Sequence, residues 1–329
     1  MRPAAVITGT GLAVPGLRDA ADLLGGLLGD GAGGGADGGP SGGGFQVAEL
    51  ERRGWKYRDR ASRLASCAAE PALREAGLLG EDGYRGPGDR SAVVVSSNFG
   101  VLENVCGAMD VLAEHGSAAL SPMGLPHTGA NMTAGWLAID HGLSGPNLTV
   151  CNGATGGIDA LYWARNLVAA DRADIVLVVG VEPDGRSVAR LHGDDGTTPG
   201  AAGRRLDGAA AVVVESTASA AARGAAPRAV PSGFGRAKDL PAAVRATVRG
   251  PVGTVLAAAD ADRPAVLEGV PVLDLTARLG GCSGALGVLQ CLAAVALFDR
   301  GETRTLLATC GGAERDDAAA ALALTPAEV

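Results

Sequence analysis

The chain has 329 residues, of which 47% are hydrophobic, 3% are aromatic and 19% are charged, with a formal net charge of -8. The acidic balance and the few aromatic side chains exclude nucleic acid as the main partner, because phosphates attract cations and unpaired bases need stacking surfaces. No apolar run reaches membrane length and no Cys-x-x-Cys pair marks a zinc site. We therefore expect a cytoplasmic protein with a large core and reduced thiols, and with no membrane partner, metal or cofactor.

The N-terminal region is predicted to begin with a strand at residues 5–10, which is apolar and ends at a glycine turn. A short helix at 20–28 follows. Residues 29–44, GDGAGGGADGGPSGGG, have low complexity and too little apolar surface to offset the entropy of ordering. We interpret them as a flexible surface loop.

A basic cluster precedes and enters the next predicted helix, at residues 61–76. Its members are Arg52, Arg53, Lys56, Arg58, Arg60 and Arg63. One interpretation is a solvated face that leads into the helix. The other is a docking patch for an acidic partner, since a local basic cluster stands out in an acidic chain.

The next predicted elements are a buried strand at 91–97 and a helix at 102–115. Histidines occur at its end and beyond, at His115, His127 and His141, and none has a second histidine at ligand spacing. An isolated histidine is usually a satisfied structural group, so a structural role is the first interpretation.

The chain is organised around residues 145–182. A short apolar strand at 148–150 is followed by a glycine-bracketed turn, an amphipathic helix at 158–169 and a fully buried strand at 175–179. A cysteine at such a turn would meet the positive end of the helix dipole, which lowers a thiol pKa and favours attack on thioesters. Cys151 lies beside this turn, so acyl transfer is one hypothesis.

Residues 121–150, SPMGLPHTGANMTAGWLAIDHGLSGPNLTV, resemble the β-ketoacyl synthase family of the thiolase superfamily. The family's pattern is matched at Ser121-Pro122, Pro126, Asn131, Ala134-Gly135, Gly142 and Gly145-Pro146. Weaker matches at 5–10 and 204–215 extend the resemblance over most of the chain. It implies an α/β fold of five αβαβα layers, built from two duplicated halves.

The C-terminal part repeats the plan of strand, glycine turn, helix and strand, at 271–276, 285–300 and 305–309. This repetition predicts a duplicated α/β unit with mostly parallel strands. We place the N-terminal half at 1–222 and the C-terminal half at 223–329, packed together as one compact unit.

The catalytic residues that the resemblance implies are changed in this chain. The family's nucleophilic cysteine lies eight residues after the proline matched by Pro146, which is Ala154 here, and Cys151 comes three residues earlier. The family's two catalytic histidines belong to the C-terminal half, but no histidine follows His192, and Arg278 occupies one of the two positions. Loss of one oxyanion donor alone costs roughly 100- to 1000-fold in rate, so we expect no condensing activity from the chain alone.

The resemblance also implies roles for other residues. The strand before the nucleophile forms the subunit interface, at Leu148, Thr149, Val150 and Cys151. The acyl pocket is expected near His127, Asn131 and Thr155, and the basic cluster is expected to dock an acyl carrier protein.

Three hypotheses follow. The first is a non-catalytic, chain-length-factor-like subunit that forms a heterodimer with an active ketosynthase in polyketide or fatty-acid-like biosynthesis and shapes its acyl pocket. Chain-length factors commonly carry Gln where this chain has Ala154, which is a departure. The second is an acyltransferase or thioesterase-like enzyme that uses Cys151, and the third is a homodimeric module that binds an acyl carrier protein.

Overall fold

The computed structural model describes residues 4–28, 50, 52, 54–55, 58–193, 203–257, 264–312 and 316–327. Every structural statement below concerns these residues. The predicted loop at 29–44 and the basic residues Arg53 and Lys56 lie outside them.

The first half of the chain contributes five strands to the main sheet, which are β1 (Ala5–Ala13), β4 (Ser91–Ser96), β5 (Asn147–Val150), β6 (Ile175–Glu182) and β7 (Gly208–Ser216). The second half contributes β8 (Ala229–Ala237), β9 (Val252–Ala257), β10 (Val272–Asp274), β11 (Thr305–Gly311) and β12 (Ala319–Pro326). The short strands β2 (Leu79–Gly80) and β3 (Gly83–Tyr84) pair only with each other.

The order of the ten strands shows the duplication directly. Outward from the middle of the sheet, the first half runs β1-β7-β6-β4-β5 and the second runs β8-β12-β11-β9-β10. Corresponding neighbours also run in the same relative sense in the two halves. The halves meet where Ile7 of β1 pairs with Ala229 of β8, and the predicted division at 222/223 falls in the connection between β7 and β8.

The prediction of mostly parallel strands is wrong. Strands β7 and β12 run antiparallel to both of their neighbours, and only the outer pairs, β6-β4-β5 and β11-β9-β10, are parallel. Each half thus has a parallel outer part, formed through helical crossovers, and an antiparallel inner part.

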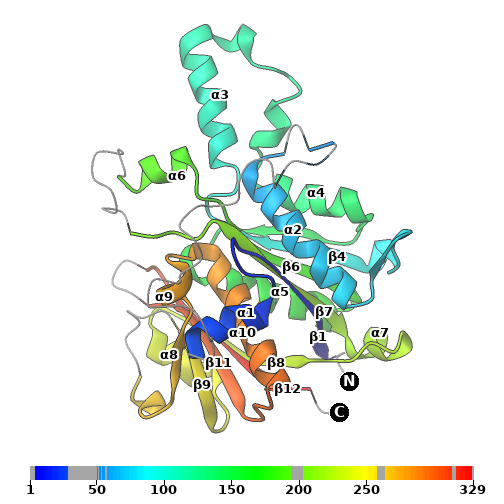
Figure 1. The fold of residues 1–329 in the computed structure, drawn as a ribbon, viewed down its shortest axis with the longest axis vertical. Helices are drawn as coiled ribbons and strands as arrows, with labels where there is room; N and C mark the ends of the chain where they lie inside the picture. The colour runs from blue at the N-terminus through cyan, green and yellow to red at the C-terminus, as the bar shows by residue number, and fades with distance from the viewer. Residues whose placement is uncertain are drawn as a thin grey trace.

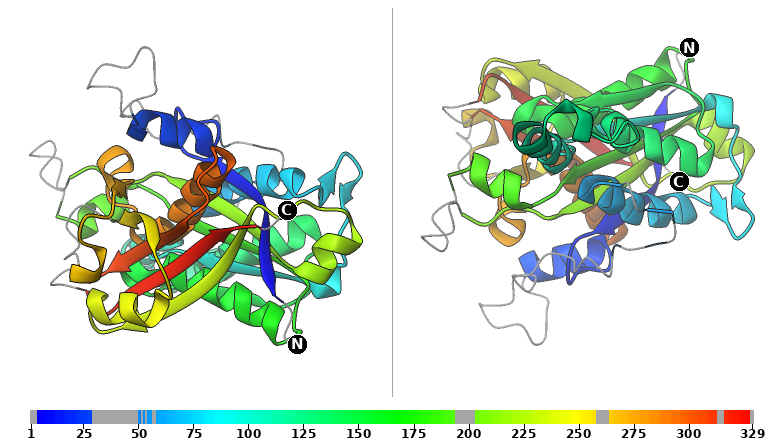
Figure 2. Two further views of the ribbon diagram at one scale, coloured as in Figure 1. Left: turned by 90° about the horizontal axis from the view of Figure 1, so that it is seen from below. Right: turned by 90° about the horizontal axis from the view of Figure 1, so that it is seen from above.

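The helices are α1 (Ala20–Leu28), α2 (Arg60–Glu75), α3 (Leu102–His115), α4 (Met132–His141), α5 (Gly156–Ala169), α6 (Arg186–Leu191), α7 (Thr217–Ala222), α8 (Leu240–Thr247), α9 (Thr276–Leu279) and α10 (Leu286–Asp299). Figures 1 and 2 show α5 and α10 enclosed between the strands of the two halves. The cluster of buried residues around these two helices is the central core, while α2 and α4 cover the outer face of the first half and α8 covers that of the second. This confirms the predicted five-layered α/β fold.

Helix α10 is apolar all round, because it is enclosed on every side: residues 286–296 are all buried. Two glycines let it cross α5 closely. A Cβ on Gly287 would lie 2.3 Å from the backbone nitrogen of Ile158, and one on Gly157 would lie 2.7 Å from that of Gly287. The start of α5 is therefore held against the start of α10.

Candidate functional site

Two equivalent turns meet at the centre of the molecule. The 3₁₀ turn Gly153–Thr155 joins β5 to α5, and the turn Ser283–Ala285 precedes α10. Asn98, just after β4, connects them: its Nδ2 donates to the carbonyl of Gly153 at 3.0 Å and to Ser283 Oγ at 2.8 Å, and its Oδ1 accepts from Gly153 N at 3.1 Å. The predicted nucleophile turn is thus present and firmly placed.

Glu182 holds the segment after β4 and the turn before α10 together. Its side chain is buried at the end of β6, and its carboxylate accepts backbone N–H groups of Asn98 at 2.9 Å, Phe99 at 3.1 Å and Gly284 at 2.9 Å. Burial raises the pKa of Glu182, and these hydrogen bonds oppose the rise. Sequence analysis missed Glu182 and Asn98; a carboxylate that ends an otherwise apolar strand was the available signal.

The turn carries no activated nucleophile. Ala154 offers a methyl group, and Cys151, at the end of β5, is exposed. Partial burial of its thiol raises the pKa of Cys151, and the charge of Glu182 raises it further. A thiol with a raised pKa is a poor nucleophile at neutral pH.

The side chains of Thr155 and Arg278 both make hydrogen bonds within the protein. Thr155 Oγ1 is buried and donates to Asp159 Oδ2 at 2.8 Å. Arg278 Nη1 donates to the backbone carbonyls of Asp22 at 2.5 Å and Leu23 at 2.7 Å, which ties α9 to α1. Within the described residues, Arg278 Nε is buried and has no hydrogen-bond partner.

The predicted interface residues lie on an edge strand. Val93 N and Ser97 N donate to the carbonyls of Pro146 and Val150, at 2.9 Å and 3.1 Å. Because successive residues of a strand turn their main-chain groups to opposite sides, the N–H and C=O groups of Thr149 face away from β4. As β5 ends the sheet, this edge is open to pairing within the part of the chain described.

Helix α3 rises away from the body of the molecule (Figure 1), and none of its residues is buried. Val105, Met109 and Leu112 are exposed by 36%, 58% and 38%. Their spacing places them on one face of the helix. Val105 also lines a cavity of about 150 Å³ together with Cys151, so this apolar face approaches the end of β5.

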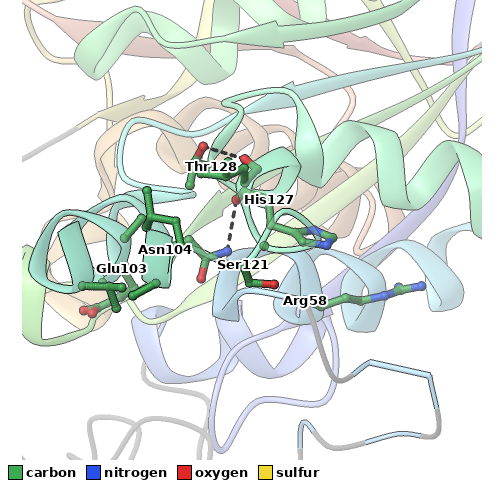
Figure 3. A pocket seen from close by; sticks show the side chains of 13 residues that line it. Arg58, Glu103, Asn104, Ser121, His127 and Thr128 are labelled. Carbon is green, nitrogen blue, oxygen red and sulfur yellow. Dashed lines mark hydrogen bonds between the residues drawn. The ribbon is translucent and has the colours of Figure 1, made fainter. Parts of the chain in front are cut away.

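A groove of about 420 Å³ separates α3 from the 3₁₀ turn Leu125–Thr128. Its apolar part is formed by Gly107, Ala108, Val111, Ala119, Leu120, Gly124 and Leu125, and its polar groups are Arg58, Glu103, Asn104, Ser121, His127 and Thr128. In the view of Figure 3, Asn104 and Ser121 lie between Glu103 on one side and Arg58 on the other. Of the three predicted acyl-pocket residues, His127 lines this groove, whereas Asn131 is exposed at the start of α4 and lines none of the cavities described.

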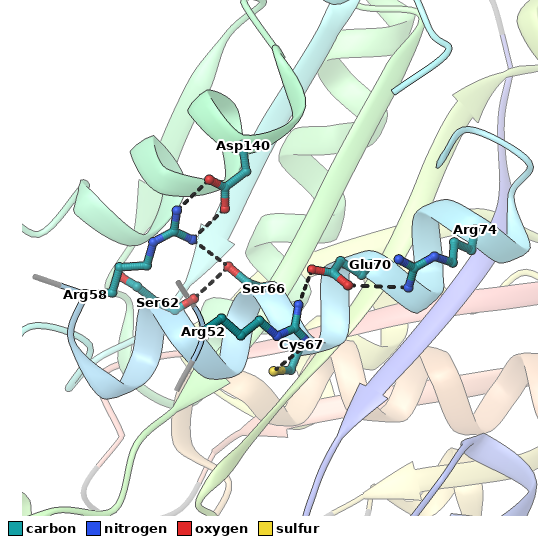
Figure 4. A network of polar contacts seen from close by, with 8 residues as sticks. All are labelled: Arg52, Arg58, Ser62, Ser66, Cys67, Glu70, Arg74 and Asp140. Atoms are coloured by element: carbon teal, nitrogen blue, oxygen red, sulfur yellow. Dashed lines mark hydrogen bonds and ion pairs between the residues drawn. The ribbon is translucent and has the colours of Figure 1, made fainter. Parts of the chain in front are cut away.

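The basic cluster is not one solvated face. The side chain of Arg58 is only 6% exposed, and both Nη atoms donate to the carboxylate of Asp140 at 2.5 Å (Figure 4). Its guanidinium lies 5.0 Å from the ring centre of Trp55 and 4.5 Å from that of Trp136. Arg58 thus binds the segment before α2 to α4 and is not a surface contact.

The other described members of the cluster also have internal partners. Arg60 Nε donates to Asp207 Oδ1 at 2.7 Å, and Arg63 Nε donates to the carbonyl of Arg58 at 3.0 Å. Arg52 is 44% exposed and pairs with Glu70 at 2.5 Å. Docking of a carrier protein on this stretch stays a prediction.

Among the described residues, no helix is long and apolar enough to cross a membrane, and no group of three or more His, Cys, Asp or Glu side chains could hold a metal ion.

Comparison with known proteins gives relatives of one kind. The family model described as "Beta-ketoacyl synthase, N-terminal domain" matches residues 46–220. The 3-oxoacyl-[acyl-carrier-protein] synthase 2 of Vibrio cholerae is 31% identical over 167 residues, which cover 46% of this chain and 40% of that protein. The synthase 2 of Rhizobium meliloti is 30% identical over 198 residues, covering 53% of this chain and 45% of that one. The chain therefore spans about half the length of these curated relatives.

Solved structures match over the whole chain. "The ishigamide ketosynthase/chain length factor" superimposes with a TM-score of 0.78 and 25% identity, covering 99% of this chain and all of that one. A type II polyketide synthase acyl carrier protein in complex with its ketosynthase, AntDE:AntF, contains a chain that superimposes with a TM-score of 0.75 at 17% identity, over 100% of both chains. The latter likeness concerns the fold alone.

Proposed function

Because the chain belongs to the β-ketoacyl synthase family, whose N-terminal domain model matches residues 46–220, we propose that it is a partner subunit without condensing activity. In this role it pairs with an active ketosynthase and supplies part of the pocket that holds the growing acyl chain. The observation that carries the proposal is the nucleophile turn, which keeps its architecture but presents Ala154 and a thiol of raised pKa.

The open edge at β5 supports pairing with another subunit. An edge strand with outward N–H and C=O groups is a template for a strand of a second chain. The apolar face of α3, at Val105, Met109 and Leu112, lies exposed nearby and would be covered in the same assembly. The match to a chain whose title names a ketosynthase and a chain length factor supports a heterodimer of this kind.

The groove between α3 and the turn at 125–128 supports the pocket-shaping role. Its volume, about 420 Å³, lies in the range of small-molecule sites, and small residues make room along one side of α3. A Cβ added at Gly107 would meet nothing within 4 Å, so larger side chains fit there and fill the groove.

The pocket-shaping role can be tested by a substitution that fills the groove. In the complex purified from its host, Gly107→Phe is expected to shift the acyl products toward shorter chains, measured by mass spectrometry of the released products. Gly135→Ala on α4, another position where an added Cβ meets nothing within 4 Å, is the matched control and should leave the products unchanged. Unchanged product lengths in Gly107→Phe would contradict the pocket-shaping role.

We also propose that an acyl carrier protein reaches this assembly. The structure titled as a carrier protein in complex with its ketosynthase shares the fold and motivates the proposal. Among the described members of the cluster, Arg52 has an exposed side chain that is compatible with a contact, whereas the guanidinium of Arg58 is enclosed.

The second candidate is an enzyme acylated on Cys151, which is exposed and lines a cavity of about 150 Å³. The raised thiol pKa disfavours it. Intact-mass analysis after incubation with an acyl thioester separates the two candidates. An acyl adduct that disappears in Cys151→Ala would support the enzyme, whereas a partner subunit keeps the activity of its complex in that variant.

A further inference from the structure

The groove beside α3 carries polar groups that a chamber for a plain hydrocarbon would not need. Asn104 Nδ2 donates to the carbonyl of His127 at 3.1 Å, which fixes the orientation of the amide. Within the described residues, the amide oxygen of Asn104 and the hydroxyl of Ser121 make no hydrogen bond, and both residues line the groove. Figure 3 shows them near its middle.

A further donor belongs to the same wall. The Nε–H of Arg58 is buried and has no hydrogen-bond partner in the part of the chain described, although its Nη atoms bind Asp140. A buried donor is normally satisfied by protein, water or ligand. Gly107, Ala108 and Val111 follow Asn104 at helical spacing on the same face of α3, and they line the groove with apolar surface only.

From these two polar groups beside an apolar strip we propose, building on the function proposed above, that the groove accepts the distal part of an acyl chain that bears a hydroxyl group there, and that Asn104 and Ser121 bind this hydroxyl. The carbon chain lies along Gly107, Ala108 and Val111. The amide oxygen of Asn104 accepts the ligand's hydrogen, and the Ser121 hydroxyl donates to the ligand's oxygen, so that these two groups are each matched once.

Calorimetric titration of the full chain with 10-hydroxydecanoate and with decanoate tests the proposal. A neutral hydrogen bond adds about 1 kcal/mol, so the hydroxylated chain is expected to bind about three- to tenfold more tightly. The double variant Ser121→Ala with Asn104→Leu should bind both chains equally, at the affinity of decanoate for the natural protein. Gly107→Phe should lose both ligands, which places them in this groove.

Equal binding of the two chains by the natural protein would overturn the proposal, as would a preference that survives in the double variant or a failure of either chain to bind. A thermal melt of each variant shows that the fold is retained. Native mass spectrometry of the double variant with the ketosynthase keeps the two inferences apart. A complex that forms normally while the hydroxyl preference is absent contradicts only the assignment of the ligand, whereas absence of any complex contradicts the partner role.

Discussion

At the scale of single residues, Glu182 gives a prediction about stability. Its carboxylate accepts backbone N–H groups from both halves, from Phe99 at 3.1 Å and from Gly284 at 2.9 Å, while it is buried. In Glu182→Gln one oxygen becomes an NH₂ group that cannot accept, so the free energy of unfolding should fall by about 1–3 kcal/mol. Urea denaturation of the natural protein and of the variant measures this difference in the free energy of unfolding.

The same variant has a predicted pH dependence. Burial raises the pKa of Glu182 in the folded state, so this side chain binds a proton more readily in the folded protein than in the unfolded chain. The stability that this contributes is present below the unfolded pKa, about 4.3, and is lost as the pH rises through the folded value. The difference in the free energy of unfolding between the natural protein and Glu182→Gln should therefore narrow as the pH is raised from about 4 toward neutral. A difference that widens over this interval would show that the ionised form is the one stabilised.

Arg58 and Arg52 make a matched pair of substitutions. Arg58→Ala leaves the Asp140 carboxylate unpaired beside two tryptophans, and removing one partner of a largely buried pair costs about 3 kcal/mol. Arg52→Ala removes a pair at a side chain that is 44% exposed and should cost less than about 1 kcal/mol. Thermal denaturation compares the stability of the two variants. Equal losses of stability would contradict the structural role of Arg58.

The partners of these arginines could not be predicted from the sequence. The basic cluster was visible as a run of arginines, but the partners of Arg58 and Arg60, which are Asp140 and Asp207, lie 82 and 147 residues away. Charge patterning reports a local excess and cannot report which carboxylates the fold brings to it. Glu182 escaped notice for the same reason, since its hydrogen-bond donors come from the segment just after β4 and from the turn before α10.

At the scale of elements, the edge strand gives the sharpest prediction. Thr149 turns its N–H toward the open edge, so Thr149→Pro removes a donor to a partner strand without removing one to β4. We expect the isolated chain to stay folded and the complex to be lost or weakened at least tenfold, the equivalent of about 1.4 kcal/mol. Thr149→Val keeps the N–H and the shape and is the control. A complex of normal stability in the proline variant would mean that the partner binds elsewhere.

The crossing of α5 and α10 gives a second prediction at this scale. A Cβ at Gly287 would lie 2.3 Å from the backbone nitrogen of Ile158, so Gly287→Ala should destabilise the fold by about 1–3 kcal/mol. Gly135→Ala on α4 meets nothing within 4 Å and should be neutral or stabilise by up to about 1 kcal/mol. Chemical denaturation of the two variants measures these changes in the free energy of unfolding. An unchanged stability in Gly287→Ala would show that the two helices can separate without cost.

The elements themselves were largely predictable, because each rests on a local pattern. The helix predicted at 102–115 coincides with α3, and the strands predicted at 91–97 and 305–309 correspond to β4 and β11 with small shifts at their ends. The sense of the strands was not predictable in this way. Only the non-local pairing of β7 and β12 reveals that they run against their neighbours.

At the scale of the whole molecule, the duplicated five-layered fold is intact, and its central turn presents Ala154. Both halves keep the same strand order, and the shared core between them includes buried residues from both. We propose that a fold of this kind serves as a partner subunit rather than as a catalyst. In the proposed assembly the second subunit binds the edge of β5, which is unpaired within the described residues, and covers the exposed face of α3.

Native mass spectrometry of the protein purified from its own host tests this account most directly. We predict a one-to-one complex with a ketosynthase that carries an active-site cysteine, and we predict that Cys151→Ala leaves the activity of that complex intact. A homodimer alone, with an acyl-sized mass increment that disappears in Cys151→Ala, would contradict the account and place the chemistry on this chain.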